Sequence, residues 1–234
     1  MFRFGRSIGG IRAVSGLVAG SIITAGVSVC EGESWPFDTR GLPTQVKLAS
    51  VPSAPPLSLA GVGMRRKNFY ITEVDVYLCG LNLSKESLAR AKEWKAGGGA
   101  DLLPKRLLEP AKARRAEGPK VSVTLSFVRA VSKSAVVNAF DGAFKGLPEA
   151  EVASFKQALG ASVGESGISK GEEIGFFWLN PTGIVVTKNG VVGEAIFSPA
   201  VEERLLSVYL DPKLTVSQEL YDSVEKNVAS VSTL

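Results

Sequence analysis

The 234-residue chain contains no histidine. This absence excludes nucleophile–imidazole pairs and triads, imidazole general bases and His-ligated metal sites. The chain has only two cysteines, Cys30 and Cys79, too few for a zinc site or a disulfide framework. Cys79 lies in an apolar run, which predicts a buried thiol that packs as a small hydrophobe. Any chemistry must come from Arg, Lys, Tyr or carboxylate side chains, and we predict no metal and no cofactor.

Acidic residues are absent before Glu31, whereas Arg3, Arg6 and Arg12 and several serines are present. This composition is typical of an organelle presequence. The uncharged run at 13–30, AVSGLVAGSIITAGVSVC, is at the short end of what spans a bilayer. Three interpretations are open: a mitochondrial presequence with an inner-membrane anchor, a plastid transit peptide, and a cleaved secretory signal. The diffuse Gly, Ala and Ser content argues against a secretory signal, which usually has a compact Leu-rich core. We predict mitochondrial targeting with an inner-membrane anchor for residues 1–30, with plastid targeting as the alternative.

The remainder of the chain is nearly neutral. Without the three leader arginines the formal net charge falls from +4 to about +1. We therefore predict no nucleic-acid partner, because such partners are bound by strongly basic surfaces. An apolar content of 45% and a mean hydropathy of +0.16 indicate a globular domain. Prolines and short polar pieces predict a linker over 31–44, followed by an edge strand from Gln45 to Val51. We therefore predict a single domain over 45–234.

The stretch from Gly61 to Leu83, GVGMRRKNFYITEVDVYLCGLNL, organises this domain. Its alternation predicts a long strand or hairpin with one buried face, carrying Phe69, Ile71, Val74, Val76 and Leu78. Gly61-Val-Gly63 lacks the third glycine and the following helix that dinucleotide binding requires. Arg65 stands beside apolar residues, and a buried guanidinium needs a carboxylate or phosphate partner. The alternative is a solvated strand end with basic side chains.

The remaining elements alternate in blocks of helix and strand. Ser84 begins a helix that Gly97 to Gly99 end, and Ser132 and Ser198 cap two further helices. The basic segment 101–120 predicts a solvated helix or variable loop in preference to a basic groove. The predicted elements are strands at 121–127, 172–179, 184–187 and 191–197, and helices at 132–147, 148–159, 199–211 and from 215. Strands joined by tight turns, with helices grouped around them, predict an α+β fold: an antiparallel sheet with helices packed on one face.

Three separate stretches resemble the chalcone isomerase-like family. They are Gly61-Val-Gly63-Met-Arg65-Arg-Lys67 with the following Tyr77-Leu-Cys-Gly80-Leu, the strand-to-helix passage VSVTLSFVRAVSKSAVVNAFDGAF, and residues 184–214 with GEAIFSPAVEERLLSVYLDPKLTVS. The resemblance covers about residues 45–230, and it implies the open-faced β-sandwich of that family.

The resemblance also implies roles for single residues. The isomerases close a ring with a strand Arg, a Thr on the next strand and a Tyr at the start of the middle helix. Arg65 matches the Arg, but Tyr77 stands where the isomerases have Thr. Three more isomerase positions are changed: Val131 replaces the helix Tyr, Ser134 replaces a Lys, and a Thr near the last meander strand falls at about Val191. We therefore predict no catalytic residue.

An Arg and a Tyr at this spacing resemble the fatty-acid-binding branch, where the pair holds a carboxylate at the inner end of an apolar cavity. A guanidinium offers two parallel charge-assisted donors to a carboxylate, and a phenol adds a third. We predict Arg65, Tyr77 and Asn138 as ligand-binding residues, because Asn138 matches an Asn on the substrate-facing side of the middle helix.

The predicted function is therefore a non-catalytic protein that binds a fatty acid or similar amphipathic carboxylate. One alternative is an intramolecular lyase of the chalcone–flavanone isomerase type. The other is a membrane-tethered structural or haem-binding protein, whose haem would need Cys or Tyr ligation because His is absent.

Overall fold

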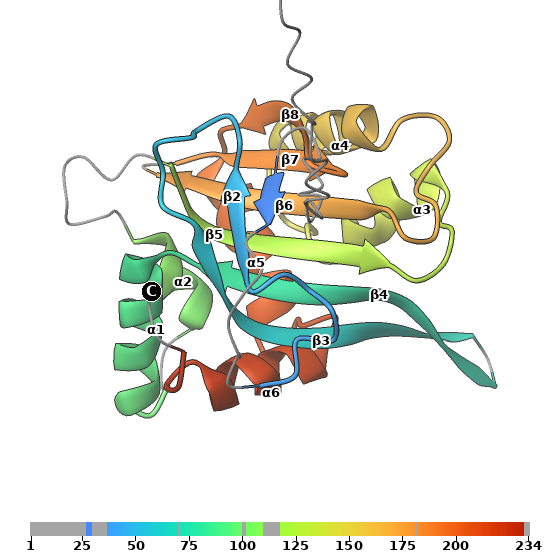
Figure 1. Cartoon of the computed structure of the whole chain (residues 1–234). Helices are drawn as coiled ribbons and strands as arrows, with labels where there is room; N and C mark the ends of the chain where they lie inside the picture. The colour runs from blue at the N-terminus through green and yellow to red at the C-terminus, as the bar shows by residue number, and fades with distance from the viewer. Residues whose placement is uncertain are drawn as a thin grey trace, which may run out of the picture.

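A computed structural model describes residues 27–29, 37–69, 71–99, 102–109, 118–180 and 182–231. Eight strands form one antiparallel sheet in which each strand pairs with its neighbours in the chain (Figure 1). The strands are β1 (Val27–Val29), β2 (Gln45–Leu48), β3 (Leu57–Phe69), β4 (Thr72–Leu83), β5 (Gly118–Phe127), β6 (Glu173–Asn180), β7 (Ile184–Lys188) and β8 (Val191–Ile196). The helices are α1 (Lys85–Ala96), α2 (Leu103–Leu108), α3 (Lys133–Val137), the 3₁₀ turn η1 (Asn138–Phe140), α4 (Glu149–Val163), α5 (Pro199–Leu210) and α6 (Gln218–Asn227).

The helices lie behind one face of the curled sheet, so the predicted α+β fold is confirmed (Figure 1). Alternation along the strands explains this arrangement, because residues two apart face the same side. The helix-facing side chains of β4, β5 and β6 form the main core; they are Cys79, Leu81, Leu83, Val121, Val123, Leu125, Ile174, Phe176 and Trp178.

The other face of the sheet is covered in part by β2. Val46 and Leu48 of β2 pack with Phe177 of β6 and Val185 of β7 in a second apolar cluster. The predicted strand beginning at Gln45 is confirmed, but it ends at Leu48 and not at Val51. It is also not an edge strand, because β1 pairs with its outer side. β1 comes from residues predicted as leader.

Helix caps and tight turns follow the sequence closely. The hydroxyls of Ser84, Ser132 and Ser198 accept hydrogen bonds from backbone N–H groups three residues later, as predicted. Asn189 and Gly190 both have positive φ, the geometry of a two-residue hairpin turn. The single helix predicted over 132–147 was wrong: α3 ends at Val137 and is followed by the 3₁₀ turn and further turns.

The β3–β4 hairpin forms a long arm that projects from the body of the domain (Figure 1). Ile71, predicted on a buried face, is 99% exposed at its tip. The alternation of apolar and polar residues continues beyond the part of the hairpin that packs in the core. It therefore did not predict where burial ends. The root of the hairpin, in contrast, is packed on both sides.

Helix α6 packs directly against the Gly61-Val-Gly63 segment of β3. A Cβ atom on Gly63 would lie 2.1 Å from the backbone nitrogen of Leu220, and one on Gly61 would lie 2.8 Å from that of Val224. Real Cβ atoms do not come this close to backbone, so both positions require glycine. The Gly-x-Gly pattern therefore serves close helix–strand approach.

The same helix also completes the hydrogen bonding along the free edge of β3. β2 pairs only with the first residues of β3, Leu57 and Ser58. Beyond them, the N–H of Val62 donates to Ser223 Oγ (3.1 Å) and the N–H of Met64 donates to Glu219 Oε2 (2.9 Å). Burial opposes ionisation of Glu219, but bonds from Arg40 and the Met64 N–H outweigh it and lower the pKa of that carboxyl. An otherwise open strand edge is thereby closed by side chains.

The predicted targeting segment at 1–30 and the linker at 31–44 lie mostly outside the described residues, so those boundaries stay predictions. Within the described part of the chain, no helix has the length and apolar character to cross a bilayer.

Substituting Gly63 by Ala should destabilise the domain by about 1–3 kcal/mol, because the added methyl group collides with the α6 backbone. The free energy of unfolding in urea measures this effect. Gly142→Ala is the matched control, since a Cβ there meets nothing within 4 Å. Equal stability of the two variants would show that α6 does not pack on β3 as described.

Candidate functional site

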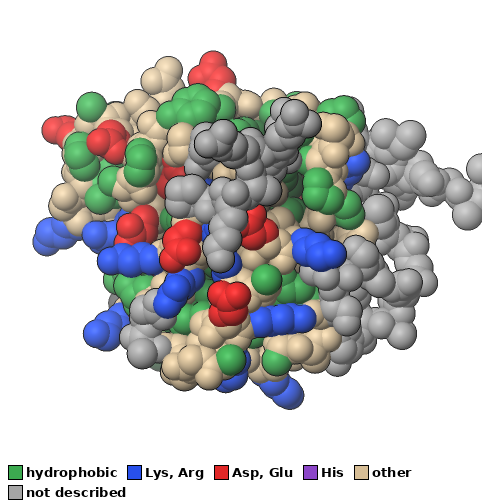
Figure 2. Space-filling model, turned by 90° about the vertical axis from the view of Figure 1, so that its left-hand side faces the viewer, with side chains coloured by type: hydrophobic (Ala, Val, Ile, Leu, Met, Phe, Trp, Pro, Cys, Tyr) green, Lys and Arg blue, Asp and Glu red, His purple; other side chains and the backbone are tan. Residues whose placement is uncertain are grey.

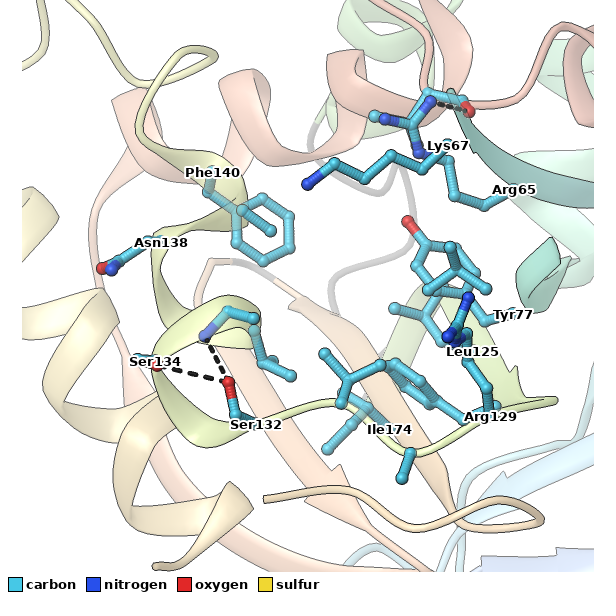
Figure 3. Close-up of a pocket in the computed structure, with 18 of the residues that line it drawn as sticks. Arg65, Lys67, Tyr77, Leu125, Arg129, Ser132, Ser134, Asn138, Phe140 and Ile174 are labelled. Carbon is cyan, nitrogen blue, oxygen red and sulfur yellow. Dashed lines mark hydrogen bonds between the residues drawn. The ribbon is translucent and has the colours of Figure 1, made fainter. Parts of the chain in front are cut away.

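A pocket of about 590 Å³ lies between the helix-facing side of the sheet and α3 (Figure 3). This volume is within the range of about 300–1,000 Å³ typical of small-molecule sites. Its buried lining is apolar and comes from β5, β6, α3, η1 and α5; the residues are Leu125, Phe127, Val136, Phe140, Ile174, Phe176 and Val208. The polar lining groups are arranged around this apolar floor.

Arg65 and Tyr77 are direct cross-strand partners in the β3–β4 pairing, and both line the pocket. The register shifts after Arg65, so that Arg66 pairs with Asp75 and Val76 has no partner on β3. This irregularity lets the consecutive residues Val76 and Tyr77 both face the cavity. The two side chains therefore line the same cavity from neighbouring strands, while their role as ligand contacts stays a prediction.

The guanidinium of Arg65 is held in place by a hydrogen bond to the backbone of another segment. Its Nη1 donates to the backbone carbonyl of Val216 at 2.9 Å, in the segment that leads into α6 (Figure 3). A guanidinium has five N–H donors, so this bond fixes its orientation and leaves donors for a ligand. The docking of α6 on β3 therefore also orients Arg65.

Tyr77 is held as a neutral phenol. Burial is the largest cause and raises its pKa, Cys79 adds to the rise, and the charge of Arg65 opposes it. The ring packs against Phe127 at a centroid distance of 5.3 Å. At neutral pH Tyr77 is a hydrogen-bond donor, as a carboxylate ligand requires, and not a phenolate base.

Cys79 confirms the prediction of a buried thiol. It is fully buried, its Sγ donates to the carbonyl of Gly63 (2.9 Å), and burial raises its pKa to about 12. A thiol in this state is a poor nucleophile and a poor ligand. Among the described residues, no group of three Cys, Asp or Glu side chains is placed to hold a metal ion.

Tyr209 of α5 lies behind this polar end of the pocket and was missed in the sequence, where it reads as an ordinary apolar position of a helix. Its pKa is raised by burial first, then by Tyr77 and Cys79, and Arg65 opposes the rise. The hydroxyl is fully buried and has no partner at ordinary hydrogen-bond distance, although the Tyr77 hydroxyl lies close enough to act as a weak acceptor. A buried hydroxyl that is at most weakly paired costs folding free energy.

Asn138 lines the pocket on the far side from Arg65 and Tyr77. In Figure 3 its amide is directed away from those two residues, so the three predicted site residues share a cavity without converging. Val131 and Ser134, at the changed isomerase positions, also line the cavity, and Ser134 contacts Ser132 (Oγ–Oγ 3.2 Å).

Val191, placed by the resemblance at a fourth isomerase position, lies outside the pocket lining. It is 62% exposed at the start of β8. The identity of this residue therefore does not affect the chemistry of the pocket.

Two further cations line the outer part of the pocket and were missed as site residues. Lys67 follows Arg65 on the same face of β3, and Arg129 comes from the loop after β5. The lysine that ends the quoted strand motif was a signal in the sequence for Lys67. Nothing in the sequence distinguishes Arg129 from other loop arginines.

No protein-family model and no curated protein matches the chain. Among solved structures, it is similar to the crystal structure of a fatty-acid binding protein of Arabidopsis thaliana. The two share 18% sequence identity with a TM-score of 0.55, over 74% of this chain and 89% of the other. The chain has the chalcone isomerase fold, as the sequence resemblance predicted.

The buried hydroxyl of Tyr209 gives a direct test of the pocket's polar end. Tyr209→Phe should leave stability unchanged or raise it by up to about 1 kcal/mol, because it removes a buried hydroxyl that has no partner at ordinary hydrogen-bond distance. Thermal and urea unfolding measure the difference, with Tyr221→Phe on α6 as a control. A loss of more than about 1 kcal/mol would show that the hydroxyl is hydrogen bonded, with Tyr77 as the candidate acceptor.

Proposed function

We propose that this chain binds a fatty acid or a similar amphipathic carboxylate in the pocket and performs no chemistry on it. The observation that supports this most strongly is the cross-strand pair of Arg65 and Tyr77 beside an apolar floor. The carboxylate accepts from the guanidinium and the phenol, and the alkyl chain lies against the aromatic and aliphatic side chains of β5, β6 and η1.

Both the alkyl tail and the carboxylate head of the ligand contribute favourable free energy to binding in this arrangement. Each CH₂ removed from water contributes about 0.8 kcal/mol, and a chain of some ten buried carbons offsets the cost of ordering and association. A hydrogen bond to a charged group adds about 1.5–3 kcal/mol. Because Val216 already holds the guanidinium, little side-chain freedom is lost when the ligand binds.

We infer that the protein performs no chemistry on its ligand from the polar groups that line the cavity. At Val131 the pocket has an aliphatic side chain where the isomerases have a phenol, so no hydroxyl at that point can polarise a ketone. Tyr77 has a raised pKa and stays protonated, which makes it a donor and not a base. The fatty-acid binding protein of similar fold adds fold-level support for a lipid ligand.

Laurate binding to the purified chain tests the proposal. Arg65→Ala should weaken binding about 10- to 100-fold, the loss of one charge-assisted contact, and Tyr77→Phe should weaken it less. Isothermal titration measures affinity, and native mass spectrometry detects lipid that co-purifies. Arg66→Ala is the matched control, because Arg66 is the adjacent residue, pairs with Asp75 (3.0 Å) and lies outside the pocket lining. Unfolding curves for each variant separate lost binding from lost folding.

Several results would contradict the proposal. One is a wild-type chain that takes up neither laurate nor palmitate. Another is an equal loss of affinity in the Arg65→Ala and Arg66→Ala variants. Ring closure of a chalcone well above background, lost in Arg65→Ala, would establish the isomerase alternative. A Soret band in the purified protein would establish the haem alternative.

A further inference from the structure

Buried polar groups distinguish this molecule more than its surface charge does. The described part of the face drawn in Figure 2 carries basic and acidic side chains beside one another. Among the described residues, three buried side chains have a polar atom without an ordinary hydrogen-bond partner: Asn82, Ser122 and Tyr209. Asn82 and Ser122 are opposite each other in the β4–β5 register and lie on the sheet face that points away from the helices. Tyr209 lies instead behind the polar end of the pocket.

Hydrogen bonds of the segment after α5 fix Tyr209 close to the anchor of Arg65. The backbone carbonyl of Tyr209 accepts from the Thr215 hydroxyl at 3.0 Å. The carbonyl of the preceding residue, Val208, accepts from the N–H of Val216 at 2.8 Å. Val216 is also the residue whose own carbonyl holds the Arg65 guanidinium. One short segment therefore holds both the end of α5 and the guanidinium.

The hydroxyl of Tyr209 lies within weak hydrogen-bonding range of the hydroxyl of Tyr77. Burial is the largest cause of the raised pKa of both phenols. The contact between the two hydroxyls is a smaller influence, which lowers the pKa of Tyr77 and raises that of Tyr209. These directions are expected when Tyr209 donates and Tyr77 accepts, because a donor stabilises the ionised form of its acceptor.

An anion in the pocket sets the direction of both phenol protons. A carboxylate only accepts hydrogen bonds, so Tyr77 must direct its single proton at the ligand and keep its lone pairs toward the protein. Cys79 does not supply a proton to these lone pairs, because its Sγ donates to the carbonyl of Gly63. Tyr209 is placed to do so. Hydrogen bonds in a chain polarise one another, so donation by Tyr209 strengthens the bond from Tyr77 to the ligand.

We propose that Tyr209 is a positioning residue for the ligand: its hydroxyl donates to the Tyr77 oxygen and keeps the Tyr77 proton directed at the carboxylate. This inference rests on the proposed function, because the anion in the pocket sets the direction of the chain. It adds a residue that lies outside the pocket lining and acts on the ligand only through Tyr77. The bond is weak in the free chain, so loss of the hydroxyl affects binding more than folding.

A double-mutant cycle on laurate affinity tests the link between the two phenols. In the full chain, Tyr209→Phe should weaken laurate binding about three- to tenfold, with the midpoint of urea unfolding unchanged or raised. In a chain that already carries Tyr77→Phe, the same substitution should change the affinity less than about twofold, because the hydroxyl through which it acts is gone. Tyr221→Phe on α6, outside the pocket lining, is the control and should leave the affinity unchanged.

The titration of bound laurate with ¹³C at the carboxyl carbon gives a readout that a merely structural role of Tyr209 would not move. A weaker bond from Tyr77 favours the ionised carboxyl less. Tyr209→Phe should therefore shift the titration of the bound carboxyl to higher pH. In the Tyr77→Phe chain, the same substitution should cause no further shift.

The outcomes separate this inference from the proposed function. If Tyr209→Phe binds laurate as tightly as the wild-type chain, and binding still depends on Arg65, the inference is wrong and the proposed function stands. Losses that simply add in the double variant would also overturn the inference, because Tyr209 would then act independently of Tyr77. A wild-type chain that does not bind laurate would contradict both.

Discussion

The close approach of α6 to β3 is the contact on which the site depends. It requires the absence of side chains at Gly61 and Gly63, because the α6 backbone occupies the space that a Cβ would take. The first turns of α6 then supply the hydrogen bonds that β2 does not reach, and the segment before the helix offers the Val216 carbonyl to Arg65. Closing the edge of the sheet and orienting the guanidinium are thus consequences of one packing event.

The pairing of β3 with β4 supplies the second half of the site. Register places Tyr77 opposite Arg65, and the irregularity after Arg65 brings Val76 to the same side. The phenol stays protonated because it is buried beside Cys79, and the Arg65 charge is too small an influence to reverse this. A cation and a neutral donor at the edge of an apolar cavity match the chemistry of the proposed ligand, an anion with an apolar tail.

Much of the architecture could be predicted because its causes are local. Some features are determined by residues only a few positions away in the chain. They are the serine caps, the Asn189-Gly190 turn and the two-residue alternation. The convergence of Arg65 and Tyr77 was predictable for the same reason, since a hairpin brings them together. The role of the two glycines was not, because their partner helix lies more than 150 residues away in the chain. Arg129 and Tyr209 join the site only through tertiary packing, and the exposed Ile71 shows that alternation does not report where the core ends.

The central claim is that Arg65 and Tyr77 hold the anionic head of the ligand at the polar end of the pocket. The most direct test is a pH titration, by NMR, of laurate carrying ¹³C at the carboxyl carbon and bound to the chain. Contact with a guanidinium favours the ionised form, so we predict that the bound carboxyl titrates at a lower pH than free laurate, and that Arg65→Ala abolishes the difference. A bound carboxyl that titrates as it does in water, or that shifts to higher pH, would place the head away from Arg65 and contradict the account.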